Sequence, residues 1–246
     1  MSKNNLFYNA KTSEKRDHFF EHQHTNDGVT EIMLHEIDKI INKHDITSIL
    51  DLGTGNGYLI AETMRRNYSV IATGYKLIGI DSSLSMLKSA RTYSKGLGIK
   101  FKQMDNHNLQ FKNETFDLIM AKAVSDVSIS EIFDKLKTGG WFIYKEYGPG
   151  RGMVEITNLL SDKPDNDSAE EKVIQMRSLG FSHTELRKYY IPLERNEEEM
   201  QTIIEVMRVL PKGISKTNAR KIVKDYFKGE IWKKISSDPY LIIGRK

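Results

Sequence analysis

The chain contains no cysteine among its 246 residues. This absence excludes disulfide bonds, thiolate nucleophiles and thiolate metal sites. No run of about 18 apolar residues occurs, so the sequence predicts no membrane-spanning helix. The first five residues also lack the apolar stretch of a secretion signal. We therefore expect a cytoplasmic protein that has no membrane as its partner.

The chain also lacks a strong charge of either sign. Its formal net charge is +4, with 39% hydrophobic and 28% charged residues, as is ordinary for a globular protein. This balance does not by itself indicate a nucleic-acid partner. The positive charge is nevertheless uneven, because residues 212–234 hold eight Lys and Arg against two acids. A single large α/β domain over residues 1–246 fits this length.

A glycine-rich turn is the most informative feature that is present. Residues 48–52 form an apolar, strand-length run that contains Asp51, and glycine then occupies positions 53, 55 and 57 before a helical pattern at 58–66. Glycine is needed where the backbone turns with positive φ or approaches a ligand closely. A helix that follows such a turn directs free N–H groups at an anionic or nucleotide ligand. The spacing differs from the dinucleotide pattern G-x-G-x-x-G, because Tyr58 takes the place of the third glycine.

Further strand patterns follow in order, and the first two end in acids. Residues 76–80 precede Asp81, about 20 residues after the glycines, where a carboxylate accepts hydrogen bonds from two ribose hydroxyls. Residues 99–104 precede Asp105. Residues 115–121 read Thr-Phe-Asp-Leu-Ile-Met-Ala, and Leu-Lys-Thr-Gly-Gly at 136–140 leads into a fifth strand.

This series resembles the motifs of class I S-adenosylmethionine-dependent methyltransferases of the small-molecule type. The resemblance covers about residues 46–146 and implies a seven-stranded, mostly parallel, doubly wound sheet of the Rossmann-like methyltransferase fold. It also implies an N-terminal helical cap over 1–45, a cofactor-binding core over 46–150 and an acceptor-side half over 151–246. The two antiparallel edge strands of that fold are here separated by about 50 residues, so a helical insertion is expected at about 196–234, before the last strand.

The resemblance implies S-adenosyl-L-methionine as cofactor and assigns roles to particular residues. Asp81 is expected to bind the ribose, and Asp105 the adenine, with Asn106 sharing or taking that role. Asp51 either contacts the methionine part or only holds the loop. A backbone carbonyl at Ala121 or Lys122 is expected to accept from the cofactor's amino group. The full set of expected cofactor residues is Asp51, Gly53, Thr54, Gly55, Asn56, Gly57, Asp81, Ser82, Met86, Asp105, Asn106 and Ala121.

The sequence contains no obligatory catalytic motif, because the cofactor carries the electrophile and the protein mainly aligns the acceptor. A D/N-P-P-Y signature is absent after the fourth strand, which disfavours adenine and glutamine as acceptors. We expect Glu146, Asp126 and Tyr8 as catalytic residues. A packed core tyrosine is an equal alternative for Tyr8. Other residues expected to line the pocket are His18, His22, Tyr147 and Arg151.

Two clusters have a simpler interpretation beside the functional one. His18 and His22 have zinc-ligand spacing, but no third ligand is indicated, so a solvated helix face is the better interpretation and no metal is expected. The basic segment 212–234 carries an apolar stripe and is expected to be helical. Packing on the domain is therefore its first interpretation, and attraction of an anionic acceptor is its second.

We therefore expect a methyltransferase that acts on O or N of a small-molecule acceptor, with an anionic acceptor as one option. The alternatives are a tRNA or protein methyltransferase that uses residues 212–234, transfer of a non-methyl group from the same cofactor, and a non-catalytic cofactor-binding subunit. Nucleic acid is the less favoured partner. The oligomeric state is left open by the sequence.

Overall fold

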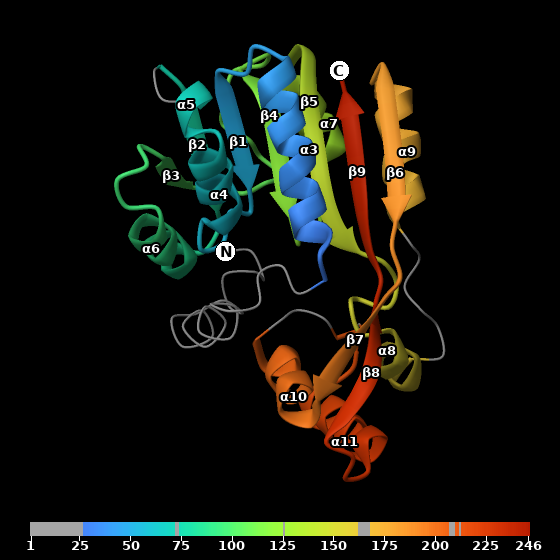
Figure 1. The fold of residues 1–246 in the computed structure, drawn as a ribbon. Helices are drawn as coiled ribbons and strands as arrows, with labels where there is room; N and C mark the ends of the chain where they lie inside the picture. The colour runs from blue at the N-terminus through green and yellow to red at the C-terminus, as the bar shows by residue number, and fades with distance from the viewer. Residues whose placement is uncertain (1–26, 72–73, 125, 162–167, 207–209, 212) are drawn as a thin grey trace.

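A computed structural model of the chain describes residues 27–71, 74–124, 126–161, 168–206, 210–211 and 213–246 (Figure 1). Its main feature is a seven-stranded sheet with the strand order β3-β2-β1-β4-β5-β9-β6. The strands are β1 (Ser48–Leu52), β2 (Lys76–Asp81), β3 (Lys100–Gln103), β4 (Phe116–Lys122), β5 (Leu136–Tyr147), β6 (His183–Lys188) and β9 (Pro239–Arg245). β1 to β5 are parallel, and β9 is antiparallel to both β5 and β6. The expected seven-stranded, mostly parallel sheet is confirmed.

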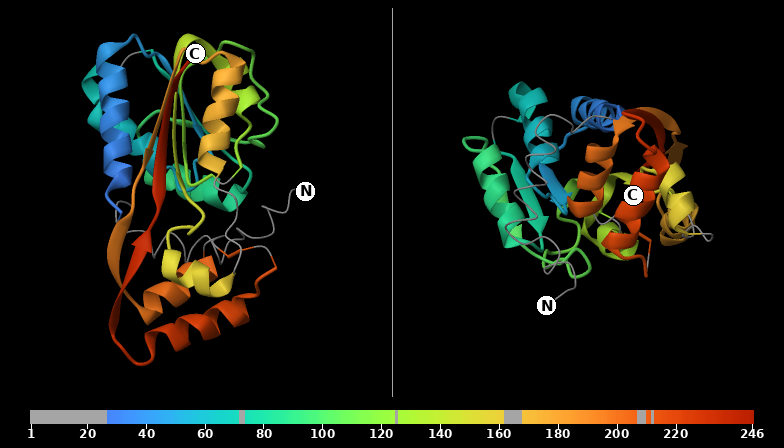
Figure 2. Two further views of the ribbon diagram at one scale, coloured as in Figure 1. Left: turned by 90° about the vertical axis from the view of Figure 1, so that its right-hand side faces the viewer. Right: turned by 90° about the horizontal axis from the view of Figure 1, so that it is seen from below.

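Helices cover both faces of this sheet. The helices beside it are α3 (Val29–Lys43), α4 (Tyr58–Arg66), α5 (Tyr68–Ile71), α6 (Leu84–Tyr93), α7 (Ile129–Lys135) and α9 (Ser168–Leu179). α3 and α4 pack their apolar sides on one face, with Ile49, Met120 and Ile143 of the sheet. α7 and α9 cover the opposite face (Figures 1 and 2). Alternate strand residues point to opposite faces, which explains why neighbouring residues of β1 contribute to separate cores.

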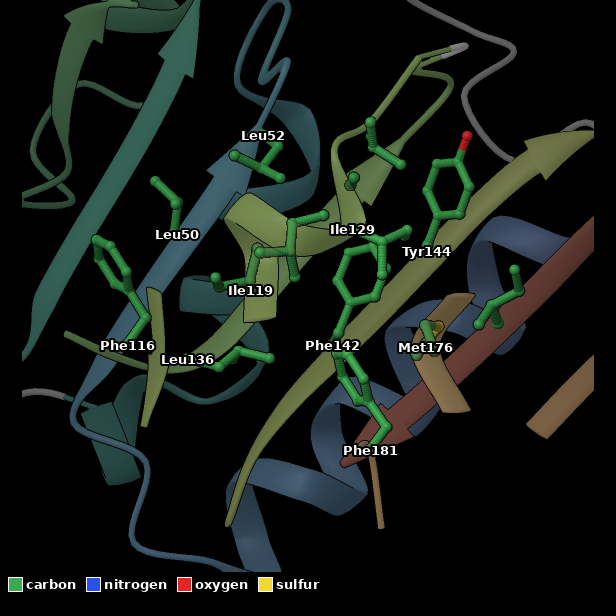
Figure 3. Close-up of a cluster of buried hydrophobic side chains, with 14 of the residues drawn as sticks. Leu50, Leu52, Phe116, Ile119, Ile129, Leu136, Phe142, Tyr144, Met176 and Phe181 are labelled. Atoms are coloured by element: carbon green, nitrogen blue, oxygen red, sulfur yellow. The ribbon is translucent and has the colours of Figure 1, made fainter. Parts of the chain in front are cut away.

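The core under α7 and α9 combines residues from strands that are far apart in the sequence. Figure 3 shows Leu50 and Leu52 of β1, Ile119 of β4, and Phe142 and Tyr144 of β5 within this one cluster. The Phe142 and Tyr144 rings are nearly parallel, with centroids 5.9 Å apart. The continuous apolar runs that the sequence displays are explained by burial of the parallel strands on both faces.

A long antiparallel ribbon leads from the sheet to a smaller lobe. β7 (Ile191–Asn196) pairs with β8 (Trp232–Ser237), and their register continues that of β6 with β9, since Lys188 opposes Tyr240 and Ile191 opposes Ser237. The ribbon is interrupted at Asp238 (Figure 2). The smaller lobe also holds α8 (Val154–Leu160), α10 (Glu197–Val206) and α11 (Lys216–Phe227) around an apolar core of its own.

Several details differ from the sequence predictions. The first of the two expected edge strands, which the sequence places at residues 185–192, is divided between β6 and β7, because the two parts belong to different sheets. The helix predicted over 212–234 was too long, since α11 ends at Phe227 and residues from Trp232 form β8. The helices α10 and α11 lie between β6 and β9, so an insertion precedes the last strand as expected.

No helix within the described residues is long and apolar enough to cross a membrane. Of the N-terminal helical cap expected over 1–45, the structure describes α3, and residues 1–26 lie outside the described residues.

Candidate cofactor and acceptor site

The glycine loop lies between β1 and α4, at the carboxyl edge of the sheet. Gly53, Gly55 and Gly57 have φ values of 59°, 55° and 80°, in the left-handed region that favours glycine. A Cβ on Gly53 would lie 2.5 Å from Val124 Cγ2, and one on Gly57 would lie 3.1 Å from Ala90 Cβ. All three glycines serve the turn, as the sequence pattern predicts, and Gly53 and Gly57 also allow close packing, which the sequence pattern did not predict.

Asp51 is a buried acid at the start of this loop, with 2% of its surface exposed. Its Oδ2 accepts a hydrogen bond of 2.6 Å from Thr54 Oγ1. Burial raises the pKa of Asp51 to about 7, although Thr54 and the positive charge of Lys122 oppose the shift. A buried acid with this pKa is suited to a cationic group, because a nearby cation favours the ionised form.

Asp81 ends β2 and joins two loops through its carboxylate. Oδ2 accepts from the Gly55 amide at 3.0 Å, and Oδ1 accepts from the Ser83 amide at 2.8 Å. A carboxylate is a hydrogen-bond acceptor, so hydroxyl groups of a ligand suit this position chemically. Ser83 also caps α6 by accepting from the Met86 amide, and the Met86 side chain is buried. Ser82 lies between Asp81 and Ser83, and its backbone carbonyl accepts a hydrogen bond from the Gln103 side-chain amide.

The loops after β3 and β4 meet beside this edge. Asp105 is exposed and accepts from the His107 amide at 2.9 Å. Asn106 is half-buried, and its amide donates to the backbone carbonyl of Asp126. His107 Nε2 also lies 3.3 Å from Asp126 Oδ2, with both side chains exposed. The structure therefore brings Asn106 and Asp126 together, which the sequence did not predict.

The ends of β4 and β5 form the next part of the site. Ala121 is buried in β4, and the half-buried Lys122 has Nζ 5.8 Å from the centre of the Tyr58 ring. Tyr144 Oη donates to the Val124 carbonyl at 2.7 Å, which holds the segment that packs on Gly53. Burial raises the pKa of Tyr144, and the negative charges of Glu146 and Asp126 raise it further.

Glu146 is half-buried near the end of β5, and its Oε1 accepts from the Tyr147 amide at 2.9 Å. Burial raises the pKa of Glu146, and the positive charges of Lys145, Lys172 and Lys122 oppose this shift. A carboxylate whose pKa is raised is better suited to accept a proton than an ordinary one.

Lys145 and Asp27 form a buried ion pair that sequence reasoning missed. Lys145 Nζ lies 2.8 Å from Asp27 Oδ2, with side chains 3% and 6% exposed. Tyr147 Oη lies 3.2 Å from the same oxygen, and the Val29 amide donates to Asp27 Oδ1. The one signal available was a lysine within an otherwise apolar strand, because buried charges require partners.

Asp238 organises the loop after β5. Its Oδ2 accepts from the Gly150 amide at 2.6 Å, and its Oδ1 accepts from the Gly152 amide at 2.8 Å. This loop holds Arg151, a half-buried residue with φ of 54°. The interruption of the ribbon at Asp238 thus fixes a loop at the same end of the sheet as the glycine turn.

Three of the predicted pocket residues lie outside the described residues: Tyr8, His18 and His22. Asn56 lies in the glycine loop, and its Oδ1 accepts from the Tyr58 amide at 3.3 Å. In the part of the chain that the structure describes, no three His, Asp or Glu side chains are grouped as metal ligands.

Part of the chain is similar in sequence to known methyltransferases. Residues 49–140 match a family model described as a methyltransferase domain. The chain is 22% identical over 173 residues to a fatty-acid O-methyltransferase of Mycolicibacterium smegmatis, covering 66% of this chain and 55% of that protein. It is 32% identical over 88 residues to the protein-lysine N-methyltransferase EFM4 of Saccharomyces cerevisiae, covering 34% of this chain and 36% of that protein.

A solved structure shares the fold of the whole chain. It is phosphoethanolamine N-methyltransferase 2 of Haemonchus contortus, in complex with phosphomonomethylethanolamine and S-adenosylhomocysteine. It superposes with a TM-score of 0.62 at 17% identity, covering 100% of this chain and 61% of that one. This chain spans less than two thirds of each of these three proteins. Residues 49–140 thus match a methyltransferase domain, and they lie within a sheet whose strand order is β3-β2-β1-β4-β5-β9-β6.

Proposed function

We propose that the chain binds S-adenosylmethionine at the carboxyl edge of β1, β2 and β4 and transfers its methyl group to O or N of a small-molecule acceptor. The observation that carries this proposal is the contact between Asp81 and Gly55, which sets a carboxylate beside a glycine turn. The residues fit the cofactor chemically. Gly53, Gly55 and Gly57 carry no side chains that would obstruct a nucleoside, and the carboxylate of Asp81 is a group that accepts hydrogen bonds from hydroxyls.

Each part of the cofactor has a residue that would hold it. Asp81 would bind the ribose hydroxyls, and Asp105 or Asn106 would bind the adenine. Asp51 would stabilise the ammonium of the methionine part through its charge, directly or through a water molecule. The carbonyl at Ala121 would accept from the same ammonium. When bound, the cofactor supplies an electrophilic methyl group, so the protein must align the acceptor and exclude water.

Glu146 is the proposed general base, with Asp126 and Tyr8 as further catalytic candidates. A hydroxyl or ammonium acceptor loses a proton on methylation, and the raised pKa of Glu146 makes its carboxylate a stronger base than an ordinary glutamate. Glu146 is expected to act on the acceptor and not to hold the cofactor. Glu146→Gln should therefore bind S-adenosylhomocysteine like wild type while losing most of its turnover.

The acceptor class is inferred from the names of similar proteins and from the charges near Glu146. The fatty-acid O-methyltransferase and the phosphoethanolamine enzyme are named for small acceptors, whereas EFM4 is named for protein lysine. We favour a small molecule because the half-buried Glu146 lies among several cations, so an acidic or zwitterionic metabolite would fit beside it. A tRNA or protein acceptor, transfer of a non-methyl group and a non-catalytic role remain the competing proposals.

The test is a screen of carboxylic acids, amines and phenols with S-adenosylmethionine, read by S-adenosylhomocysteine formation and by product mass. Turnover that is lost in Glu146→Gln and in Asp81→Ala supports the proposal. A product heavier than a methylated acceptor would instead identify a different transferred group. Tight cofactor binding with no turnover on any class, including RNA and protein, would support the non-catalytic role.

A further inference from the structure

The turn between α11 and β8 exposes two large apolar side chains. Ile231 is 76% exposed and Trp232 is 54% exposed. The backbone makes this turn through Lys228 and Gly229, which have φ values of 47° and 82°. The Glu230 amide donates to the Phe227 carbonyl, so the turn is hydrogen-bonded and the apolar pair is presented on a defined support. Adjacent exposed apolar residues of this size indicate a contact surface.

Exposed lysines precede and follow this apolar pair in the sequence. Lys221 and Lys224 lie on α11, on the side opposite the buried Ala219 and Val223, and Lys228 is the exposed C-cap residue of this helix. Lys234 lies two residues after Trp232, so both side chains point to the same face of β8. We call this set, Lys221, Lys224, Lys228, Ile231, Trp232 and Lys234, the lysine–tryptophan tip.

The charge of the tip is largely uncompensated. Arg220 pairs with Glu205, and Lys233 pairs with Glu230. Lys221, Lys224, Lys228 and Lys234 form no ion pair with any residue that the structure describes. Asp225 is an exposed acid on α11 between these lysines, so the segment from Lys221 to Lys234 has five lysines against two acids. A partner of negative charge is therefore favoured.

The tip lies at the far end of the smaller lobe. Figure 2 shows α11 and the start of β8 at the end of the molecule that is most distant from the seven-stranded sheet. Contact with a flat surface at this end would leave the carboxyl edge of the sheet uncovered. The tip is thus distinct from the proposed cofactor site.

We propose that the lysine–tryptophan tip binds the surface of an anionic phospholipid bilayer. Trp is enriched at the level of lipid headgroups, and lysines near an anionic leaflet are attracted to its surface potential. Transfer of the exposed Ile231 side chain from water into the apolar part of a bilayer is favourable in free energy. Our expectation of no membrane partner came from the lack of a spanning run, and a surface contact requires no such run.

The composition of the tip disfavours the other classes of anionic partner. Lysine is depleted in protein–protein interfaces, where arginine is enriched. Trp232 offers a ring on which a base could stack, but nucleic-acid sites favour arginine, and Ile231 offers no second ring. The four unpaired cations of the tip are all lysine.

The experiment is co-sedimentation of the full chain with vesicles. Vesicles of equal parts phosphatidylcholine and phosphatidylglycerol are compared with vesicles of phosphatidylcholine alone. We expect binding to the anionic vesicles only, weakened at least tenfold by Ile231→Ser/Trp232→Ser and by Lys228→Ser/Lys234→Ser. The matched controls, Leu159→Ser/Ile174→Ser and Lys95→Ser/Lys100→Ser, change side chains that are similarly exposed elsewhere and should bind like wild type.

Fluorescence gives a readout at the tip itself. The chain has two tryptophans, so Trp141→Phe leaves Trp232 as the sole reporter. Its emission should shift to shorter wavelength with the anionic vesicles and return when salt is raised to about 0.5 M, because salt screens surface charges. No binding, or equal loss in the control variants, overturns the proposal. Binding of an RNA oligonucleotide through the same lysines, without vesicle binding, also overturns it.

Discussion

Thr54 Oγ1 lies 2.6 Å from Asp51 Oδ2 and donates a hydrogen bond to that carboxylate at the buried start of the glycine loop. The Thr54 hydroxyl, the Ile60 amide and the charge of Lys122 do not compensate the loss of water around this carboxylate, so the pKa of Asp51 is raised to about 7. Asp51 therefore changes its charge near pH 7, at the place where the cofactor is proposed to bind.

The first prediction concerns stability and pH. From about pH 4 to pH 7 the folded chain keeps a proton on Asp51 that the unfolded chain has lost, so this residue lowers stability as pH rises. At about 1.4 kcal/mol for each tenfold change in protonation, the effect reaches up to about 4 kcal/mol above pH 7. Asp51→Asn should thus be more stable than wild type at pH 8 and not at pH 5, as measured by urea unfolding. The exposed Asp45→Asn is the control, and equal pH profiles for all three proteins would contradict the assignment.

The second prediction concerns ligand binding and pH. If Asp51 stabilises the ammonium of the cofactor, the ionised form must bind more tightly, because an opposite charge favours it. The affinity for S-adenosylhomocysteine should increase from pH 5.5 to pH 8 in wild type. Asp51→Asn should bind more weakly and lose this dependence, which calorimetry at several pH values measures. A pH dependence that survives in Asp51→Asn would assign it to another group.

The third prediction concerns Gly53. Alanine at a left-handed position costs about 1–2 kcal/mol, and a Cβ on Gly53 would also lie 2.5 Å from Val124 Cγ2. Gly53→Ala should therefore lose about 1–3 kcal/mol more than Gly96→Ala, which has a φ of 87° but open space. The Val124→Ala change added to Gly53→Ala should recover part of this extra loss. Equal losses at Gly53 and Gly96 in chemical unfolding would show that the contact with Val124 is unimportant.

The fourth prediction concerns the buried pair of Lys145 and Asp27. Burial raises the pKa of Asp27, but the charge and hydrogen bond of Lys145 outweigh it and hold that pKa below its usual value. Lys145→Met leaves this carboxylate buried without its cation and should cost about 3–5 kcal/mol in the free energy of unfolding. Lys39→Met, which removes an exposed partner of Glu36, should cost about 0–1 kcal/mol.

The double variant Asp27→Leu/Lys145→Met distinguishes a buried charge effect from simple loss of packing. It should be more stable than Lys145→Met, since no charge is left without a partner. Because the folded pKa of Asp27 is depressed, its stabilisation is present near neutral pH and is lost as pH falls through that pKa. Additive losses in the double variant would argue against this explanation.

Local chemistry explains what the sequence could predict. The glycines at 53, 55 and 57, and the acids Asp51 and Asp81, follow short apolar strands, so the loop and its edge of the sheet can be read from neighbouring residues. The division between β6 and β7 cannot be read from neighbouring residues. It lies opposite Asp238, which separates β8 from β9 and accepts hydrogen bonds from a loop 86 to 88 residues earlier in the sequence. Val124 is an unremarkable side chain in the sequence, and only the fold brings it against Gly53.

The same reason explains the error at the basic segment. Ile231 and Trp232 continue the apolar stripe of α11 in the sequence, but the left-handed Lys228 and Gly229 end the helix. The pairing of Trp232 with Asn196 then begins strand β8 directly after Ile231. Pairing partners so distant in the sequence are not visible in a local pattern.

The central claim is that Asp81 and the glycine loop form a cofactor site. Calorimetric titration of S-adenosylmethionine and S-adenosylhomocysteine into wild type and Asp81→Ala tests it most directly, with circular dichroism to check folding and Asp45→Ala as control. We predict dissociation constants on the order of micromolar for wild type and the control, and at least a tenfold weaker affinity, about 1.4 kcal/mol, for Asp81→Ala. A folded wild-type protein that binds neither compound, or an Asp81→Ala variant that binds both as tightly as wild type, would contradict the claim.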